Sequence, residues 1–381
     1  MPLTRRRFVE SIGAATATMT FGAGPSLAQA PGPAPARPYV PPPPDPLAIR
    51  LDSNESPSAP GPAVTKAVMD ALTQGNRYPR NVFDLAEALA KVHGVTRDNI
   101  FVGAGSGELL KAAVPAFVDP KRGLVSVLPT FNTCVGVAKS LNLPVREVPV
   151  TDAMLLDFPA LEAASADAGL VYLCNPNNPT ATLVPTKDIE GLLDRLAQRS
   201  PDTVTILDEA YAHFVESPEY RSLAARAAND RRLLVFRTFS KVYGLAGLRV
   251  GYAIGHPDTL ARLRMRATSD FLTVTSIAAA LAALAEPDTV TSRVASNREA
   301  RALTVQEFQS LGLKVFPSEA NFILVDVKRP AAEFFAACRK EHVSIGRPFA
   351  GLTTQVRISI GTVDEMRRAT AVFKRLLTAA A

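Results

Sequence analysis

Short apolar runs alternate with longer amphipathic stretches along most of this chain. The runs have the length and composition of buried strands; they are NIFVGA (99–104), GLVSVL (123–128), LPVREVPV (143–150), GLVYLC (169–174), TVTILD (203–208), LLVFRT (233–238) and RVGYAIG (249–255). Between them lie stretches with the helical spacing of apolar residues, such as DLAEALAKVHG (84–94) and TKDIEGLLDRLAQRS (186–200). This alternation predicts an α/β fold with a mostly parallel sheet between two layers of helices.

The pattern changes after about residue 257, where a long helical region leads into a second α/β part. That part contains LKVFPSEANFILVDV (313–327), a helix near 331–341, the strand VRISIG (356–361) and a last helix from about Val363. We therefore expect a large domain and a smaller C-terminal one. The predicted segments are an export signal (1–30), a proline-rich linker (31–46), an N-terminal arm (47–80), a large domain (81–270) and a small domain (271–381).

Polar residues follow several of the predicted strands, where ligands bind in open α/β sheets. The strand at 99–104 continues into GAGSGELLK, with Ser106 and Gly107 at a predicted helix start near Glu108. Free N–H groups at a helix start favour a phosphate, although such a turn taken alone is more often a plain turn. After 169–174 comes NPNNPTA (175–181), whose two Asn-Pro pairs present the amide of Asn178 in a defined loop.

Two further strand ends carry ionisable groups. In DEAY, Asp208 ends a buried-type strand, where a carboxylate needs a cationic partner unless it caps a turn, and Tyr211 follows three residues later. The segment RTFSKVYGLAGLRVGY (237–252) combines hydroxyl groups, an amine and a guanidinium; the residues are Thr238, Ser240, Lys241 and Arg249. Arg249 is either a surface charge or a ligand of a bound anion.

In the small domain, QVRISIGT places Arg357 inside an apolar strand. An arginine there needs an anion, which is either an internal carboxylate or a substrate carboxylate held by the two-pronged guanidinium. An amine nucleophile, a carboxylate, a phenol, an amide, a phosphate turn and a carboxylate-binding arginine together fit pyridoxal 5′-phosphate and an amino acid. In such sites a lysine forms the Schiff base and an aspartate faces the pyridine nitrogen.

Composition and charge exclude several other classes of protein. Of the 381 residues, 47% are hydrophobic and 20% charged, which is typical of a globular protein, and the formal net charge is +6. No basic run or RNA-type aromatic motif appears, so no nucleic acid partner is expected. The three cysteines form no disulfide framework, and the four histidines lack metal-ligand spacing, so no metal site is expected.

The N-terminus has the layout of an export signal. MPLTRRRFVESIGAATATMTFGAGPSLAQA starts basic, continues weakly apolar and ends small-x-small at residues 28–30. TRRRFVE resembles the bacterial twin-arginine signal, so we expect export of the folded protein to the periplasm, or a cytoplasmic location if the signal is not used. A disordered basic tail is the alternative. The stretch is too weakly apolar for a membrane anchor, and PGPAPARPYVPPPPDP (31–46) reads as an extended spacer.

From about residue 47 to its end, the chain resembles the class I/II aminotransferases of the type I pyridoxal-phosphate fold, and within them the histidinol-phosphate aminotransferase branch. The motifs that carry this resemblance occur in the family's order and are highly specific as a set. They are LDSNESPSAPGP, RYP, GAGSGE, PTF, NPNNPTA, DEAY, RTFSKVYGLAGLRVGY, SEANFILV and VRISIGT.

The resemblance implies a role for each matching residue. Lys241 would form the internal aldimine and move the proton, Asp208 would face the pyridine nitrogen, and Tyr211 would hydrogen-bond the phenolic oxygen. The other residues implied to bind the cofactor are Ser106, Gly107, Glu108, Phe131, Asn178, Thr238, Ser240, Arg249 and, in the neighbouring subunit of a homodimer with shared active sites, Tyr78. The residues implied to bind substrate are Asn54, Arg347 and Arg357, with Arg357 on the α-carboxylate. The arm (47–80) would pack on the small domain and on the partner subunit.

Departures from the family pattern leave the substrate open. The ring-stacking tyrosine is replaced by Phe131, the loop ends in Ala181 where glycine is usual, and Arg347 is either a second anion ligand or a surface charge. The expected partners are an amino donor (an L-amino acid or histidinol phosphate) and a 2-oxo acid acceptor. The alternatives are a decarboxylase or β-lyase on the same fold, and a non-catalytic exported binding protein.

Overall fold

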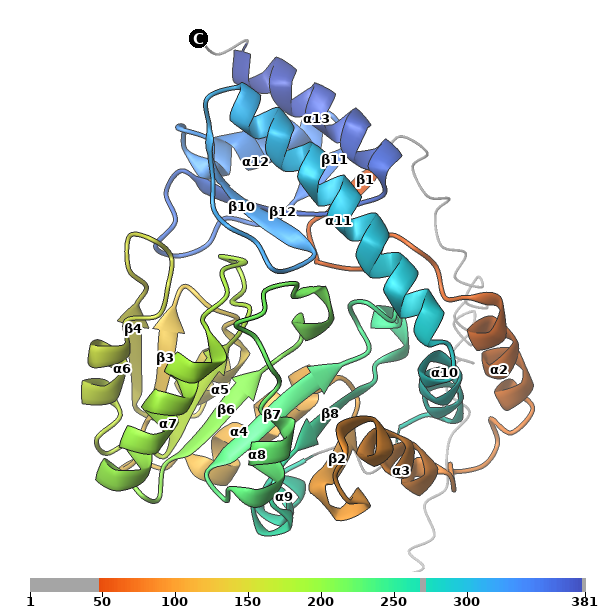
Figure 1. Cartoon of the computed structure of the whole chain (residues 1–381), viewed down its shortest axis with the longest axis vertical. Coiled ribbons are helices and arrows are strands. Elements are labelled where there is room, and N and C mark those ends of the chain that lie inside the picture. Colours follow the sequence, from red (N-terminus) through yellow and green to blue (C-terminus); the bar gives the residue numbers. More distant parts are fainter. Residues whose placement is uncertain (1–47, 268–271, 379–381) are drawn as a thin grey trace, which may run out of the picture. The chain divides into compact units, whose positions relative to one another are not determined.

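The computed structural model describes residues 48–267 and 272–378 (Figure 1). The chain divides into two units, Met1–Asp45 and Pro46–Ala381. The export signal and the proline-rich linker predicted for residues 1–46 lie outside the described residues and stay predictions. The boundaries predicted within the rest of the chain, at residues 80 and 270, also stay predictions.

The largest sheet of the described residues has seven strands in the order β2-β8-β7-β6-β5-β3-β4. They are β2 (Ile100–Gly103), β3 (Leu124–Leu128), β4 (Val145–Pro149), β5 (Leu170–Cys174), β6 (Val204–Asp208), β7 (Leu233–Thr238) and β8 (Gly251–Ile254). Neighbouring strands from β4 to β7 are parallel, whereas β8 runs antiparallel to both β7 and β2. The predicted α/β fold with a mostly parallel sheet is confirmed.

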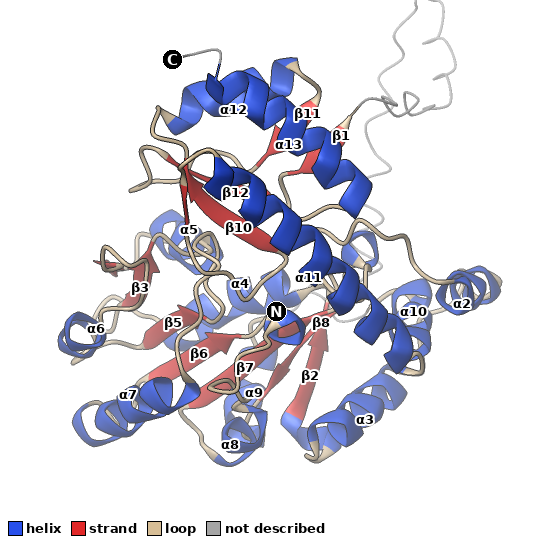
Figure 2. Ribbon diagram, turned by 45° about the horizontal axis from the view of Figure 1, so that its top comes forward, coloured by secondary structure: helices blue, strands red, loops and turns tan. Residues whose placement is uncertain are grey.

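Helices cover both faces of this sheet. Successive residues of its strands point to opposite faces, and the residues on both faces are apolar. In β7, for example, Leu233 and Val235 pack in one hydrophobic cluster and Leu234 and Phe236 in the other. Figure 2 shows α7 and α8 on one side of the sheet and α4 and α5 on the other. The helices of this part are α3 (Val82–His93), α4 (Ser106–Phe117), α5 (Thr133–Ser140), α6 (Phe158–Ala164), α7 (Thr186–Arg199), α8 (Ala224–Asn229) and α9 (Pro257–Arg264).

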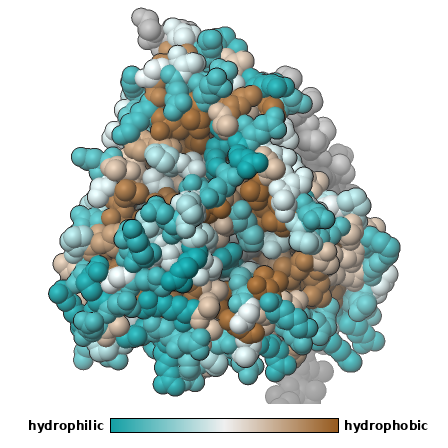
Figure 3. Space-filling model, viewed as in Figure 1, coloured by the Kyte–Doolittle hydropathy of each residue, from teal (hydrophilic) through white to brown (hydrophobic). Residues whose placement is uncertain are grey.

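Helix α7 illustrates how the sequence pattern selects the packed face. Its buried side chains recur at Ile189, Leu192, Leu193 and Leu196, which lie on one stripe of a helix with 3.6 residues per turn. The opposite face is charged and exposed, and Figure 3 shows a mostly hydrophilic surface in this region of the molecule.

Helices α2 (Pro62–Leu72) and α10 (Val274–Leu284) pack against each other, although about 200 residues separate them in the chain. Ile277 and Ala280 of α10 are fully buried and belong to the same hydrophobic cluster as Val64 of α2 and one face of the large sheet. The segment after the arm's first strand is therefore held against the part of the molecule that contains this sheet.

A second α/β assembly follows, coloured blue in Figure 1. Its antiparallel sheet has the order β12-β10-β9, and a parallel pair joins β1 to β11. Its elements are β9 (Lys314–Val315), β10 (Phe322–Asp326), β11 (Val343–Ile345), β12 (Gln355–Ser359), α11 (Pro287–Ser310), α12 (Ala331–Lys340) and α13 (Val363–Thr378), with β1 (Ile49–Leu51) from the arm. Across the described residues, no helix has the length and apolar character needed to cross a membrane.

Candidate active site

A cavity of about 580 Å³ lies at the carboxyl ends of β5, β6 and β7 and is closed by the arm and by the second α/β assembly. Most of the residues predicted from the sequence line it: Asn54, Ser106, Gly107, Phe131, Asn178, Asp208, Tyr211, Thr238, Ser240, Lys241, Arg249, Arg347 and Arg357. Residues from segments more than 300 positions apart in the chain therefore meet in one place.

Two of the predicted residues do not line this cavity. The carboxylate of Glu108 accepts a hydrogen bond from the backbone N–H of Ala104 (2.7 Å), so it holds the turn before α4. Tyr78 is 82% exposed and lines a different cavity, next to Arg77 and Asn81. Its predicted role in a neighbouring subunit is not tested by a single chain.

One end of the cavity gathers the groups expected around a phosphate. Helix α4 begins there at Ser106, after Gly105 with a left-handed φ of 81°. This backbone conformation favours glycine, and a side chain at Gly105 would also have to displace the guanidinium of Arg249. Thr238 Oγ1 donates to Ser240 Oγ (3.0 Å), and Arg249 Nη1 lies 3.4 Å from the same oxygen.

The Asp208 side chain lies on the sheet face that carries α4. Its carboxylate is almost fully buried and accepts hydrogen bonds from Tyr172 Oη (3.0 Å) and the Ala210 N–H (3.1 Å). Burial raises the pKa of Asp208 to about 6, because desolvation outweighs these two donors and the nearby Lys241. A cation placed against this carboxylate would restore its charge, and a protonated ring nitrogen is such a cation.

The Lys241 amine lies between this carboxylate and the arm. Its Nζ donates to the backbone carbonyl of Ser53 (3.2 Å) and lies 5.6 Å from the centroid of the Tyr211 ring. Burial, and then the positive charge of Arg357, lower the pKa of Lys241 to about 8. The amine is thus far closer to losing its proton near neutral pH than an ordinary lysine, as a nucleophile and proton carrier requires.

Two polar side chains link the large sheet to the second α/β assembly. Arg357 Nη1 donates to Asn178 Oδ1 (2.8 Å), and Arg357 Nη2 donates to the backbone carbonyl of Asp52. Arg357 Nε is buried without a hydrogen-bond partner among the described residues. Such a group is costly unless a ligand uses it, so an anion at this end of the cavity fits.

The wall beside Arg357 is aromatic. Two guanidinium groups lie near the ring of Phe349: the ring centroid is 4.9 Å from Cζ of Arg347 and 5.1 Å from Cζ of Arg357. Phe335 of α12 and Phe131 also line the cavity. A flat apolar group can pack here while two arginines remain within reach of anionic groups.

Several lining residues were missed by the sequence reasoning. Asp52 and Ser53 lie in the motif LDSNESPSAPGP but received no role, and Phe335 and Phe349 carry no signal in the sequence, because tertiary packing brings them to the cavity. Tyr172 does not line the cavity but donates to Asp208; its signal was weak, since a tyrosine two residues before the end of an aliphatic strand shares a face with that strand's last residue.

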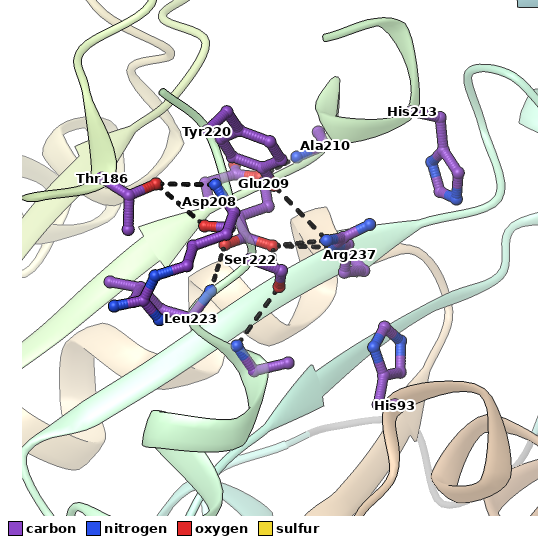
Figure 4. Close-up of polar contacts among 12 residues, drawn as sticks. His93, Thr186, Asp208, Glu209, Ala210, His213, Tyr220, Ser222, Leu223 and Arg237 are labelled. Atoms are coloured by element: carbon purple, nitrogen blue, oxygen red, sulfur yellow. Dashed lines mark hydrogen bonds and ion pairs between the residues drawn. The ribbon is translucent and has the colours of Figure 1, made fainter. Parts of the chain in front are cut away.

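A buried ion pair lies on the other side of the sheet, directly behind Asp208 (Figure 4). Glu209 Oε2 accepts from Arg237 Nη2 (2.6 Å) and Nε (2.9 Å) and from Ser222 Oγ (2.7 Å), while Oε1 accepts from the Leu223 N–H (3.0 Å). The pair joins the ends of β6 and β7, the strands that carry Asp208 and Thr238 into the cavity. Since each of these bonds joins two different segments of the chain, the ion pair fixes the spacing of the β6 and β7 ends behind the cavity.

We expect Arg237→Met to lower the free energy of unfolding by about 3–5 kcal/mol, because it leaves the Glu209 carboxylate buried and unpaired. Urea unfolding followed by fluorescence or circular dichroism measures the change. The double variant Glu209→Gln/Arg237→Met should recover part of the loss. Arg146→Met, which removes an exposed pair with Asp167, serves as the control and should leave the free energy of unfolding almost unchanged. Equal losses in Arg237→Met and Arg146→Met would contradict this account.

Two histidines flank Arg237 in the same region, as Figure 4 shows for His93 and His213. Burial, and then the charge of Arg237, lower the pKa of His93 to about 4 and that of His213 to about 3. The unfolded chain therefore binds more protons than the folded one below the ordinary value of 6.5, so stability falls as the pH drops from 6.5 towards 4.

At pH 5 the expected loss is about 1–2 kcal/mol for each of these histidines relative to pH 7.5. Urea unfolding of His93→Gln/His213→Gln should show a smaller decrease over this interval than the native chain does. An identical decrease in both proteins would rule out these two imidazoles as its source.

The donor set of the cavity fits pyridoxal phosphate. A helix start with two hydroxyl groups and an arginine suits a dianionic phosphate, a buried carboxylate suits a protonated ring nitrogen, and an amine of lowered pKa suits an aldehyde. No group of His, Cys, Asp and Glu side chains within residues 48–267 and 272–378 is arranged to hold a metal ion.

Comparisons with known proteins agree with this geometry. The family model described as aminotransferase class I and II matches residues 47–373. A histidinol-phosphate aminotransferase from Symbiobacterium thermophilum is 36% identical over 86% of this chain and 90% of its own length, and an aromatic amino acid aminotransferase from Thermobifida fusca is 34% identical over 83% and 87%. The crystal structure of the histidinol-phosphate aminotransferase from Sinorhizobium meliloti in complex with pyridoxal-5′-phosphate superposes with a TM-score of 0.81 at 28% identity, covering 88% of this chain and 92% of that one.

Proposed function

Because the chain belongs to the class I and II aminotransferase family and is a pyridoxal-phosphate-dependent aminotransferase, we propose that it takes the amino group of a donor with a flat ring and one anionic group and passes it to a dicarboxylic 2-oxo acid. Histidinol phosphate is the first candidate donor, and an aromatic L-amino acid is the second. The observation that carries this proposal is that Arg347 and Arg357 both lie against the Phe349 ring in the cavity that Lys241 and Asp208 also line.

The residues that would hold the cofactor are distributed around the cavity by its chemistry. The α4 N-terminus, Thr238, Ser240 and Arg249 would bind the phosphate. Asp208 would keep the ring nitrogen protonated, and Asn178 and Tyr211 would donate to the phenolic oxygen. Pyridoxal phosphate, when bound, accepts the electron pair that the donor's reacting carbon gives up with its proton.

The chain's own groups position the donor and move its proton. Arg357 binds the anionic group next to the reacting carbon, which is a phosphate in histidinol phosphate and a carboxylate in an amino acid. Lys241 Nζ takes the proton from that carbon and returns it in a later step of the amino-group transfer. The lowered pKa of Lys241 allows both roles. Phe131 and Phe349 pack against the donor's ring and exclude water from it.

The second arginine gives a test of the acceptor. We expect Arg347→Ala to raise the KM for 2-oxoglutarate about 10–100-fold, because one charge-assisted contact to its distal carboxylate is lost. The KM for pyruvate, which has no distal carboxylate, should change far less. Steady-state kinetics with both acceptors measure the difference, and an equal change in both would mean that Arg347 does not contact the acceptor.

A donor and acceptor screen tests the function itself. Histidinol phosphate and the aromatic amino acids are offered with 2-oxoglutarate, and the 2-oxo product, carbon dioxide and ammonia are measured. The expected result is product formation with ring-bearing donors and little release of the two gases. Turnover restricted to donors without a ring would overturn the proposed substrate class.

We also propose that two copies of the chain form a homodimer and that the N-terminal segment directs export. Tyr78 together with Met69, Leu72 and Phe83 exposes apolar surface that a second copy would cover, and the twin-arginine-like sequence supports export. Light scattering of the purified protein tests the dimer, and fractionation of bacterial cells tests the location.

A further inference from the structure

Asn54 occupies an unusual position in the arm, directly between the second α/β assembly and the cavity. Its φ of 52° lies in the left-handed region, which asparagine tolerates better than most residues. Only 1% of its surface is exposed. An amide so deeply buried is held by its hydrogen bonds, and each of them can be followed.

Three bonds fix the residue to the second assembly. The Asn54 N–H donates to Ser359 Oγ (2.8 Å), the Ser359 hydroxyl donates to Asn54 Oδ1 (2.9 Å), and Asn321 Nδ2 donates to the Asn54 carbonyl (3.0 Å). Since Oδ1 accepts the Ser359 proton, the NH₂ end of the amide points the other way. It donates to Tyr211 Oη at 3.1 Å.

This bond determines what the Tyr211 hydroxyl can do. A phenol has one proton to donate. Because its oxygen already accepts from Asn54, that proton remains for a ligand in the cavity that Tyr211 lines. Asn178 is constrained in the same sense, since its Oδ1 accepts from Arg357 and leaves its NH₂ group for a ligand. Tyr211 and Asn178 thus each present a donor, and not an acceptor, to the cavity.

We propose that Asn54 is a positioning residue, not a substrate ligand: held by Ser359, it directs the Tyr211 proton into the cavity, towards the phenolic oxygen of the cofactor. This inference rests on the proposed function of the site. Asn54 acts only through Tyr211, so its effects should disappear when the Tyr211 hydroxyl is absent.

A spectroscopic titration can detect this effect without measuring turnover. The phenolic oxygen shares a proton with the nitrogen of the lysine–cofactor linkage, so a donor on that oxygen favours loss of the nitrogen's proton. Removing the donor should raise the pH midpoint of the visible absorbance change. The titratable and charged groups near Tyr211 that also influence this midpoint are Cys174, Asp208, Lys241 and Arg357.

The experiment compares Asn54 variants with and without the Tyr211 hydroxyl. Asn54→Asp keeps the shape and the left-handed backbone but replaces the donor with an acceptor, and Asn54→Gly removes the amide altogether. Both are titrated in the native background and in Tyr211→Phe, using the full-length protein saturated with pyridoxal phosphate. Asn142→Asp is the matched control, because Asn142 is also left-handed (φ 54°) but exposed and outside the cavity.

We expect the midpoint to rise by about one pH unit in Asn54→Asp and in Tyr211→Phe, which corresponds to one hydrogen bond to a charged group, and by less in Asn54→Gly. It should not rise further in the double variant, and it should stay unchanged in Asn142→Asp. An unchanged midpoint in both Asn54 variants would overturn the proposal, as would a shift that persists in full without the Tyr211 hydroxyl. If the native protein shows no titratable band that depends on Lys241, the proposed function of the site fails first and this inference fails with it.

Discussion

Lys241→Ala is expected to reduce turnover by about 10⁴-fold or more and to abolish the visible absorbance of lysine-bound pyridoxal phosphate. The residue supplies both the amine that binds the cofactor covalently and the base that moves the substrate proton, and no other amine lines the cavity within the described residues. Binding of the phosphate by the α4 N-terminus does not depend on this amine, so the variant should still retain cofactor non-covalently.

Absorbance spectra and single-turnover kinetics check this expectation. Lys91→Ala is a suitable control, because Lys91 is an exposed lysine of α3 that pairs only with Glu87 on the same helix. Added methylamine should restore a measurable part of the rate if the missing amine is the cause. Native turnover in Lys241→Ala would remove this residue from the chemistry.

Asp208→Asn is expected to lower turnover by about 10³-fold while the fold is retained. The amide oxygen can still accept from the Ala210 N–H, and the amide NH₂ group, in place of the oxygen that faces Tyr172, can donate to the Tyr172 hydroxyl, so the geometry of the β6 end should persist. It cannot supply the negative charge that keeps a ring nitrogen protonated, and the cofactor would then store electrons poorly. The loss should therefore appear in kcat much more than in the affinity for the donor.

The measurement is kcat and KM for one donor and acceptor pair, together with the thermal midpoint of unfolding. Asp157→Asn is the control, since Asp157 caps α6 through the Ala160 N–H and asparagine caps equally well. A loss of activity that follows a loss of thermal stability would mean that Asp208 has only a structural role.

Periodicity was sufficient to predict the seven strands of the large sheet and the fold class, whereas the short strands β1 and β11 were not predicted. A run such as Leu170–Cys174 is apolar at every position because both faces of the strand are covered. This feature of a parallel sheet can be recognised in the amino-acid sequence. The direction of β8 was not predictable in this way. The hydrophobic pattern of a strand is the same for either strand direction. The antiparallel pairing of β8 with β7 and β2 depends on the path of the chain after residue 238.

The sequence by itself determined which chemical groups this protein possesses: the amine at Lys241, the carboxylate at Asp208 and the amide at Asn178, each at or after the end of a predicted strand, and the guanidinium at Arg357 inside another strand. Only the tertiary structure decided which atoms of these groups meet. The bond from Asn54 to Tyr211 spans 157 residues and the bonds from Asn54 to Ser359 span 305. Periodicity and spacing describe neighbours along the chain, whereas the direction in which a buried amide or phenol donates its proton is set by partners that only folding brings to hydrogen-bond distance.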